Sequence, residues 1–235
     1  MRFRRNFLGA RPMKASRQQW LVLNHDLPVS AAIARFSFSQ EKAIGFELVE
    51  AQGRLVRAKF IEKIEAIEEV ASLDGRVEQV SVIRYVTFDF SVAKLSSEVS
   101  LVKIIKPPVS LKSFVKMLME ALDYRATLKK LSFDLCSVYA SIARDVAVDR
   151  VIVSKLTVSQ VPLGRNATSR VEVASTENAL SEFLENYNAP AMKIEKISIS
   201  LRIRHEPEVL ELTSAGSICC TPGVEFYLEK TISIS

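Results

Sequence analysis

Alternation of hydrophobic and polar residues is the clearest pattern in this chain. Between residues 196 and 204, isoleucine or leucine occupies every second position, and Lys, Ser or Arg lies between them. This period of two is typical of a β-strand with one buried face. Similar patterns predict further strands over residues 18–23, 31–38, 44–50, 54–57, 77–90, 98–105, 128–139, 151–161, 169–174 and 224–234.

Two of these predictions include pairing. We expect residues 18–23 to pair with residues 31–38 across the turn at Asn24–Pro28, and residues 151–161 to form a hairpin with residues 169–174. Both connections contain proline and asparagine, which favour turns.

Apolar residues at helical spacing predict three helices, over residues 58–71, residues 110–124 and a segment that opens at Thr176 and ends before residues 188–190. Ser110 is a candidate N-cap for the second helix. The apolar stripe of the first helix, which lies opposite several glutamates, contains Phe60, Ile64, Ile67 and Ala71.

Helix-then-strand units recur along the chain. They predict a β-rich α+β fold with a mostly antiparallel sheet, about three helices and repeated β-β-α units. We divide the chain into a basic N-terminal arm, residues 1–17, and one α+β domain, residues 18–235. Two similar lobes that meet near residues 106–110 are the alternative.

The positive charge of the chain lies almost entirely in this arm. The net charge is +5, from 32 Lys and Arg against 27 Asp and Glu. Six bases precede the first acid, Asp26, which leaves 26 bases against 27 acids in the remainder. The six are Arg2, Arg4, Arg5, Arg11, Lys14 and Arg17.

Three interpretations of the arm stay open. Clustered arginines neutralise phosphates and release counterions, which predicts contact with nucleic acid. An arginine-rich segment without acids also resembles a mitochondrial-type targeting segment, although Pro12 interrupts it. Alternatively, the arm extends into solvent or lies on the body or on a neighbouring subunit, with Phe3 and Phe7 as anchors.

The polar face of the strand at residues 196–204 is the second candidate surface. It carries Lys196, Ser198, Ser200, Arg202 and Arg204. Hydroxyl groups and guanidinium groups on alternate positions could follow a phosphate backbone. The alternative is an ordinary solvent face, on which Lys and Arg protect the sheet from aggregation.

Candidate catalytic residues are few. His25 and His205 are isolated, and no zinc-ligand spacing or glycine-rich phosphate loop occurs. Asp89 and Asp134 both lie in predicted strands, so adjacent strands would let them hold Mg²⁺, as metal-dependent nucleases require. The alternative is that both are solvated acids.

The cysteines and the hydropathy indicate the cellular compartment of the protein. Three cysteines do not make a disulfide framework, and the adjacent Cys219 and Cys220 lie in a predicted turn. These features predict a reduced, cytoplasmic protein. No apolar run reaches the roughly 20 residues that span a membrane, so we expect no membrane span.

The function predicted from these features is that of a non-catalytic binding or assembly subunit without a cofactor. It would engage nucleic acid, or a partner chain such as a second copy, through the arm and the basic strand face. One alternative is a metal-dependent nuclease or phosphoesterase that uses Asp89 and Asp134. Another is a self-assembling shell or filament protein, in which the final strand completes a neighbour's sheet.

Overall fold

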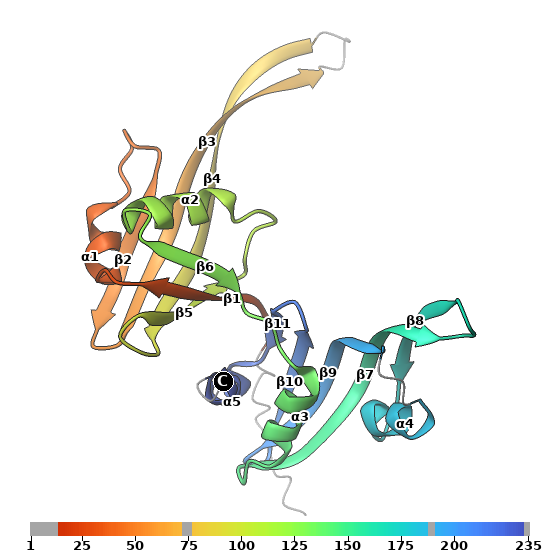
Figure 1. Ribbon diagram of the computed structural model, residues 1–235. Helices are drawn as coiled ribbons and strands as arrows, with labels where there is room; N and C mark the ends of the chain where they lie inside the picture. Colours follow the sequence, from red (N-terminus) through yellow and green to blue (C-terminus); the bar gives the residue numbers. More distant parts are fainter. Residues whose placement is uncertain (1–13, 72–76, 188–190, 233–235) are drawn as a thin grey trace, which may run out of the picture.

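A computed structural model describes residues 14–71, 77–187 and 191–232. In these residues, eleven strands form one antiparallel sheet, in the order β2-β3-β4-β5-β1-β11-β10-β9-β7-β8, with β6 paired to β1 (Figure 1). The strands are β1 (Ser16–His25), β2 (Ile44–Gln52), β3 (Leu55–Ala71), β4 (Val77–Lys94), β5 (Val99–Ile105), β6 (Ala126–Lys130), β7 (Val148–Pro162), β8 (Thr168–Ala174), β9 (Lys193–Ile203), β10 (Glu206–Thr213) and β11 (Ser217–Cys220).

Five helices pack on this sheet in the described part of the chain. They are α1 (Val29–Arg35), α2 (Lys112–Ala121), α3 (Leu135–Ala143), α4 (Ala179–Asn186) and α5 (Pro222–Ile232). None of the helices in the described ranges is both long enough and apolar enough to cross a membrane.

Strand β1 joins the two halves of the sheet. One of its edges pairs with β5, and the other pairs first with β11 and then with β6. Neighbouring residues of a strand point to opposite faces, so Trp20 enters one hydrophobic core while Leu21 and Leu23 enter the other. The cores therefore lie on opposite faces of the sheet.

The core of the N-terminal half lies between the sheet and helices α1 and α2. Phe114 of α2 stands over four phenylalanines of β2, β3 and β4, with ring centroids 5.0–6.3 Å away and steeply inclined ring planes. Such edge-to-face contacts add to the gain from burying apolar area. The four are Phe46, Phe60, Phe88 and Phe90.

The core of the C-terminal half lies on the other face, beneath α3, α4 and α5. The predicted alternation in β9 is confirmed, because Ile197, Ile199, Leu201 and Ile203 are all buried there. Val224 and Leu228 of α5 are fully buried against the same core. The helix covers the junction between the two halves of the sheet (Figure 1).

Strands β3 and β4 extend well beyond the rest of the sheet. Pairing of β2 with β3 ends at Glu62, and pairing of β5 with β4 reaches only Phe90. Nine further residue pairs, from Lys63 opposite Tyr85 to Ala71 opposite Val77, form a two-stranded segment that leaves the body (Figure 1). We call residues 63–71 and 77–85 the projecting ribbon.

The helix predicted over residues 58–71 is wrong, because the segment lies in β3. Every residue of β3 has a partner in β4, and Ala58 and Phe60 alternate with more exposed neighbours. The apolar spacing of three and four at Ile64, Ile67 and Ala71 imitated a helix. Pairing with the Val-rich and aromatic β4 outweighs that local preference.

Three predicted strands also needed correction. Residues 31–38 lie mostly in α1, so they do not pair with β1, whose partners are β5, β6 and β11. Residues 128–139 divide between β6 and α3. Of the strand predicted over residues 224–234, residues 224–232 lie in α5 and the last two lie outside the described residues. Pro222 suits the first position of α5, where a helix needs no amide donor.

Strands β10 and β11 were not predicted, whereas the remaining elements follow the predicted pattern. The hairpin of β7 and β8 and the strands β1, β2, β4, β5 and β9 are confirmed, with boundaries that differ by a few residues. Helix α2 lies inside its predicted range, and α4 begins at Ala179 with Asn178 as its N-cap. The β-rich α+β class is confirmed with more helices than expected, while the repeated β-β-α unit stays a prediction.

Candidate functional site

Most of the predicted basic arm lies outside the described residues. This applies to Arg2, Arg4, Arg5 and Arg11. Lys14 and Arg17 are described, and both are exposed. Arg17 lies in β1 opposite Cys219 of β11, so the arm enters the fold at the centre of the sheet.

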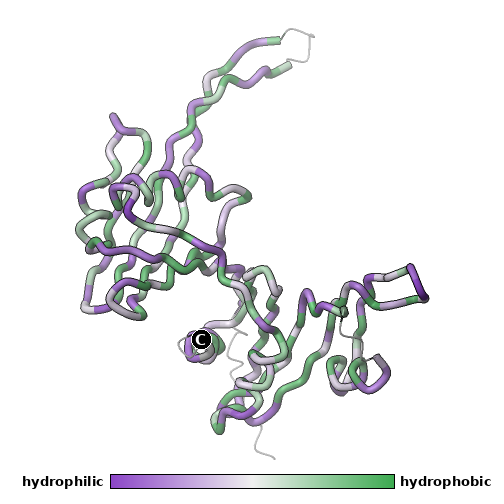
Figure 2. Tube along the Cα trace, viewed as in Figure 1, coloured by the Kyte–Doolittle hydropathy of each residue, from purple (hydrophilic) through white to green (hydrophobic). Residues whose placement is uncertain are grey.

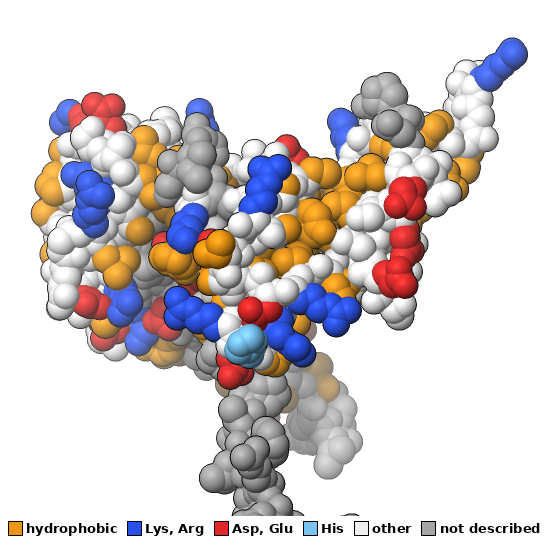
Figure 3. Space-filling model, turned by 90° about the horizontal axis from the view of Figure 1, so that it is seen from below, with side chains coloured by type: hydrophobic (Ala, Val, Ile, Leu, Met, Phe, Trp, Pro, Cys, Tyr) orange, Lys and Arg blue, Asp and Glu red, His pale blue; other side chains and the backbone are white. Residues whose placement is uncertain are grey.

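The predicted basic face of β9 is partly neutralised by acids on its neighbours. Lys196 forms an ion pair with Glu211 of β10 at 2.9 Å. Lys155 of β7 lies opposite Ser198 and is 3.7 Å from Glu172. Figure 3, which views the molecule from below, shows Lys and Arg side chains in separate groups with acidic and hydrophobic side chains between them.

The most basic part of this face is the end of β9. Arg202 lies opposite Arg150 of β7, and both side chains are exposed without an ion pair in the described residues. Arg204 follows in the turn to β10, where its amide donates to the Ala147 carbonyl at 3.1 Å. The sequence could not reveal Arg150, because its position beside Arg202 depends on the register between β7 and β9.

The two carboxylates proposed for metal binding lie in different halves of the fold. Asp89 is on β4, opposite Lys59, whereas Asp134 is the N-cap of α3. Asp134 was predicted in a strand, and this is wrong. In the described ranges, no group of three or more His, Cys, Asp and Glu side chains could hold a metal ion.

Asp134 has a clear structural role. Its carboxylate accepts hydrogen bonds from the Ser137 hydroxyl at 2.6 Å and from the amides of Cys136 and Ser137 at 3.1 and 3.4 Å. The bond from the Ser137 hydroxyl, followed by those from the amides, holds the pKa of Asp134 below its usual value, although partial burial opposes this. The side chain therefore stabilises the first turn of α3.

His25 makes the nearest approach to a catalytic pair. Its Nε2 is 2.8 Å from the Ser100 hydroxyl, and its Nδ1 is 2.7 Å from the Leu27 carbonyl. With the proton on Nδ1, the ring donates to Leu27 and accepts from Ser100, as a base would. His25 and Ser100 line a pocket of about 350 Å³, but Ser100 is only 2% exposed, which disfavours attack on a substrate. The contacts anchor the turn before α1.

His205 lies in the turn between β9 and β10. Its amide donates to the Asp149 carboxylate at 2.7 Å, and its imidazole Nδ1 is 3.3 Å from the same group. No nucleophile contacts His205 in the described residues. The contact with Asp149 fixes the turn.

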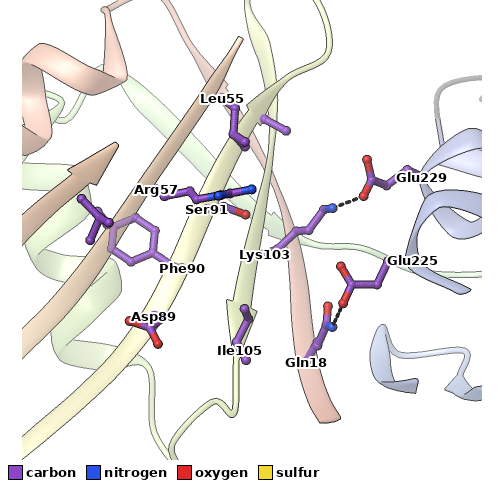
Figure 4. A pocket seen from close by; sticks show the side chains of 13 residues that line it. Gln18, Leu55, Arg57, Asp89, Phe90, Ser91, Lys103, Ile105, Glu225 and Glu229 are labelled. Atoms are coloured by element: carbon purple, nitrogen blue, oxygen red, sulfur yellow. Dashed lines mark hydrogen bonds and ion pairs between the residues drawn. The ribbon is translucent and has the colours of Figure 1, made fainter. Parts of the chain in front are cut away.

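A pocket of about 500 Å³ lies at the junction of the two halves, between α5 and the sheet (Figure 4). Acidic, basic and amide groups line it together with apolar residues. Its charged and amide groups are Gln18, Arg57, Asp89, Lys103, Glu225 and Glu229. Opposite charges therefore face one another across the space, and no single sign dominates.

The polar contacts of the pocket attach α5 to the sheet. Lys103 of β5 forms an ion pair with Glu229, and its Nζ lies 5.0 Å from the centre of the Trp20 ring. Gln18 donates to Glu225 and accepts from the Trp20 indole at 2.7 Å. These bonds reach from β1 and β5 to the helix (Figure 4). The geometry suits a clamp better than a catalytic centre.

Two of the three cysteines lack the low pKa of a reactive nucleophile. Cys219 and Cys220 lie in β11 rather than in the predicted turn, and Cys220 is fully buried. Burial, with a smaller effect from Glu225, raises the pKa of Cys220 to about 12. Burial also raises the pKa of Cys136. These two thiols therefore stay protonated at neutral pH.

The projecting ribbon is the surface that the sequence interpretation missed. Seven of its eighteen residues are large hydrophobic residues with exposed side chains. One face presents Ile64, Val70 and Val80, and the other presents Ile67, Val77, Ile83 and Tyr85. Figure 2 shows hydrophobic positions alternating with hydrophilic ones along both of its strands.

Comparison with known proteins gives no guide to function. No protein-family model matches the chain, and no curated protein matches it either.

We predict that the Asp134 carboxylate stabilises the fold as a helix cap. Asp134→Ala should lower the free energy of unfolding by about 1 kcal/mol, and Asp134→Asn by less, because asparagine also caps helices. Since the folded-state pKa is lowered, the ionised group stabilises the fold above its unfolded pKa, and this stabilisation disappears as pH falls through the folded value. Urea unfolding at several pH values measures this. A loss of stability that depends on Mg²⁺ would contradict the capping role.

We also predict that Lys103 holds α5 against the sheet. Lys103→Met should lower the free energy of unfolding by about 1–2 kcal/mol, because it removes the ion pair with Glu229 and the contact with Trp20. Proteolysis within residues 222–232 should become faster. Lys116→Met, at an exposed site on α2, is the control. Equal stability and equal proteolysis of the two variants would show that the pocket does not act as a clamp.

Proposed function

We propose that this protein is a non-catalytic assembly subunit that engages a partner chain through the projecting ribbon. The observation that carries the proposal is the exposure of large hydrophobic side chains on both faces of that ribbon. An isolated two-stranded ribbon is only marginally stable in water, and clustered exposed apolar groups mark interaction sites. A partner chain that covers the ribbon would stabilise it and would remove its apolar side chains from water.

The chemistry of the rest of the chain supports this choice. Asp134 caps a helix, and Cys220 is a buried thiol with a high pKa. The hydroxyl beside His25 belongs to Ser100, which is only 2% exposed. In the described residues, then, the groups best placed for acid–base or nucleophilic chemistry all have structural roles.

Nucleic acid is the second candidate partner. The side-by-side pair of Arg150 and Arg202 favours it, together with the basic arm of residues 1–17. Unpaired guanidinium groups bind phosphate oxygens in a forked geometry. The surrounding ion pairs limit this basic area, so we rank it below the ribbon.

The test uses a double variant, Ile67→Thr with Ile83→Thr. Threonine preserves strand propensity but removes apolar surface from side chains that are 72% and 53% exposed. We expect self-association, measured by sedimentation over a range of concentrations, to weaken at least tenfold, while urea unfolding of the dissociated chain changes little. The control, Leu163→Thr with Val209→Thr, removes exposed aliphatic groups elsewhere and should leave association unchanged.

Two results would contradict the proposal. One is equal association of the ribbon variant and the control. The other is a monomeric wild-type chain that binds fluorescent DNA or RNA with an affinity that falls steeply with salt, which would favour the nucleic-acid alternative.

A further inference from the structure

The projecting ribbon is acidic as well as apolar. It contains four glutamates, Glu65, Glu68, Glu69 and Glu78, against two bases, Lys63 and Arg84. Lys63 pairs with Glu65 at 2.6 Å, and Arg84 pairs with Glu68. Glu69 and Glu78 form no ion pair with another described residue, and four glutamates against two bases give residues 63–71 and 77–85 a net charge of −2.

This negative charge disfavours direct packing of the ribbons of two copies against each other. If two ribbons packed on each other, their negative charges would lie close together in a contact that excludes water, which is unfavourable. The apolar groups on both faces still need cover. A suitable partner surface is therefore basic and carries large hydrophobic side chains.

The chain itself contains a segment with this chemistry. Residues 1–17 hold six bases and no acid, with Phe3, Phe7 and Leu8 among them. We propose that the projecting ribbon of one copy binds the basic arm of a second copy. This inference rests on the proposed function, since it names the partner that the ribbon engages.

The position of the arm favours a neighbouring copy over the same chain. Lys14 lies just before β1, and Arg17 lies in β1 beside β11, at the centre of the sheet. The ribbon, by contrast, leaves from β3 and β4 and points away from the C-terminal half (Figure 1). The contact joins two different surfaces, so it is heterologous. Repetition of such a contact forms a ring or an open chain of copies.

A charge-swap experiment tests the inference in the full chain. The ribbon variant, Glu69→Lys with Glu78→Lys, and the arm variant, Arg4→Glu with Arg5→Glu, should each weaken self-association roughly five- to tenfold. A chain that carries all four substitutions should recover part of the lost association, because the two acids introduced in the arm can pair with the two bases introduced in the ribbon. An equimolar mixture of the two variants should also associate, because the unchanged arm of the ribbon variant meets the unchanged ribbon of the arm variant.

The control, Glu185→Lys with Glu206→Lys, makes the same change in net charge at exposed sites away from the ribbon, and it should not weaken association. Sedimentation over a range of concentrations measures every sample. A ribbon variant that weakens association, with an arm variant that does not, would overturn this inference but leave the ribbon as an interface.

Two further results are decisive. Failure of both the four-fold variant and the mixture to restore association would show that the ribbon and the arm do not touch. Restoration by the four-fold variant without restoration in the mixture would show that each arm binds its own ribbon. Loss of association in the Ile67→Thr, Ile83→Thr chain with no effect of any charge variant would support the proposed function alone.

Discussion

The burial of β1 on both of its faces is the constraint on which the rest of the fold depends. Trp20 fills the core beneath α5, while Leu21 and Leu23 fill the core beneath α1 and α2. Because successive side chains of a strand point in opposite directions, the two halves of the sheet bury opposite faces. The two cores are therefore offset across the sheet. At the junction between the halves, Lys103 of β5 forms an ion pair with Glu229 and so attaches α5 to the sheet.

The same arrangement explains why the ribbon projects. The neighbours of β3 and β4 stop pairing at Glu62 and Phe90, where the phenylalanine core around Phe114 also ends. Beyond that point the alternation that buries Phe60 and Phe88 continues into residues with nothing to cover them. The ribbon thus has the apolar pattern of a buried strand but no element that covers it in the described residues. This is the physical reason for proposing that a partner chain binds the ribbon.

The sequence predicted strands best where one face is buried throughout, as in β9. It failed for β3, where Ile64 and Ile67 mimic helical spacing. The strand conformation of β3 is set by its pairing with β4, which the local spacing of apolar residues does not reveal. The candidate sites show the same limit. Charge and composition identified the arm, but the pairing of Arg150 with Arg202, the cap made by Asp134 and the exposure of the ribbon all depend on three-dimensional neighbours.

Amide hydrogen exchange of the ribbon, measured by mass spectrometry across a range of protein concentrations, tests the central claim most directly. If a partner chain covers the ribbon, peptides from residues 63–71 and 77–85 should exchange fast in dilute samples and slow down as concentration rises. Peptides from β9 should exchange slowly throughout, because that strand is paired on both sides. Exchange in the ribbon that is equally fast, or equally slow, at every concentration would contradict the account.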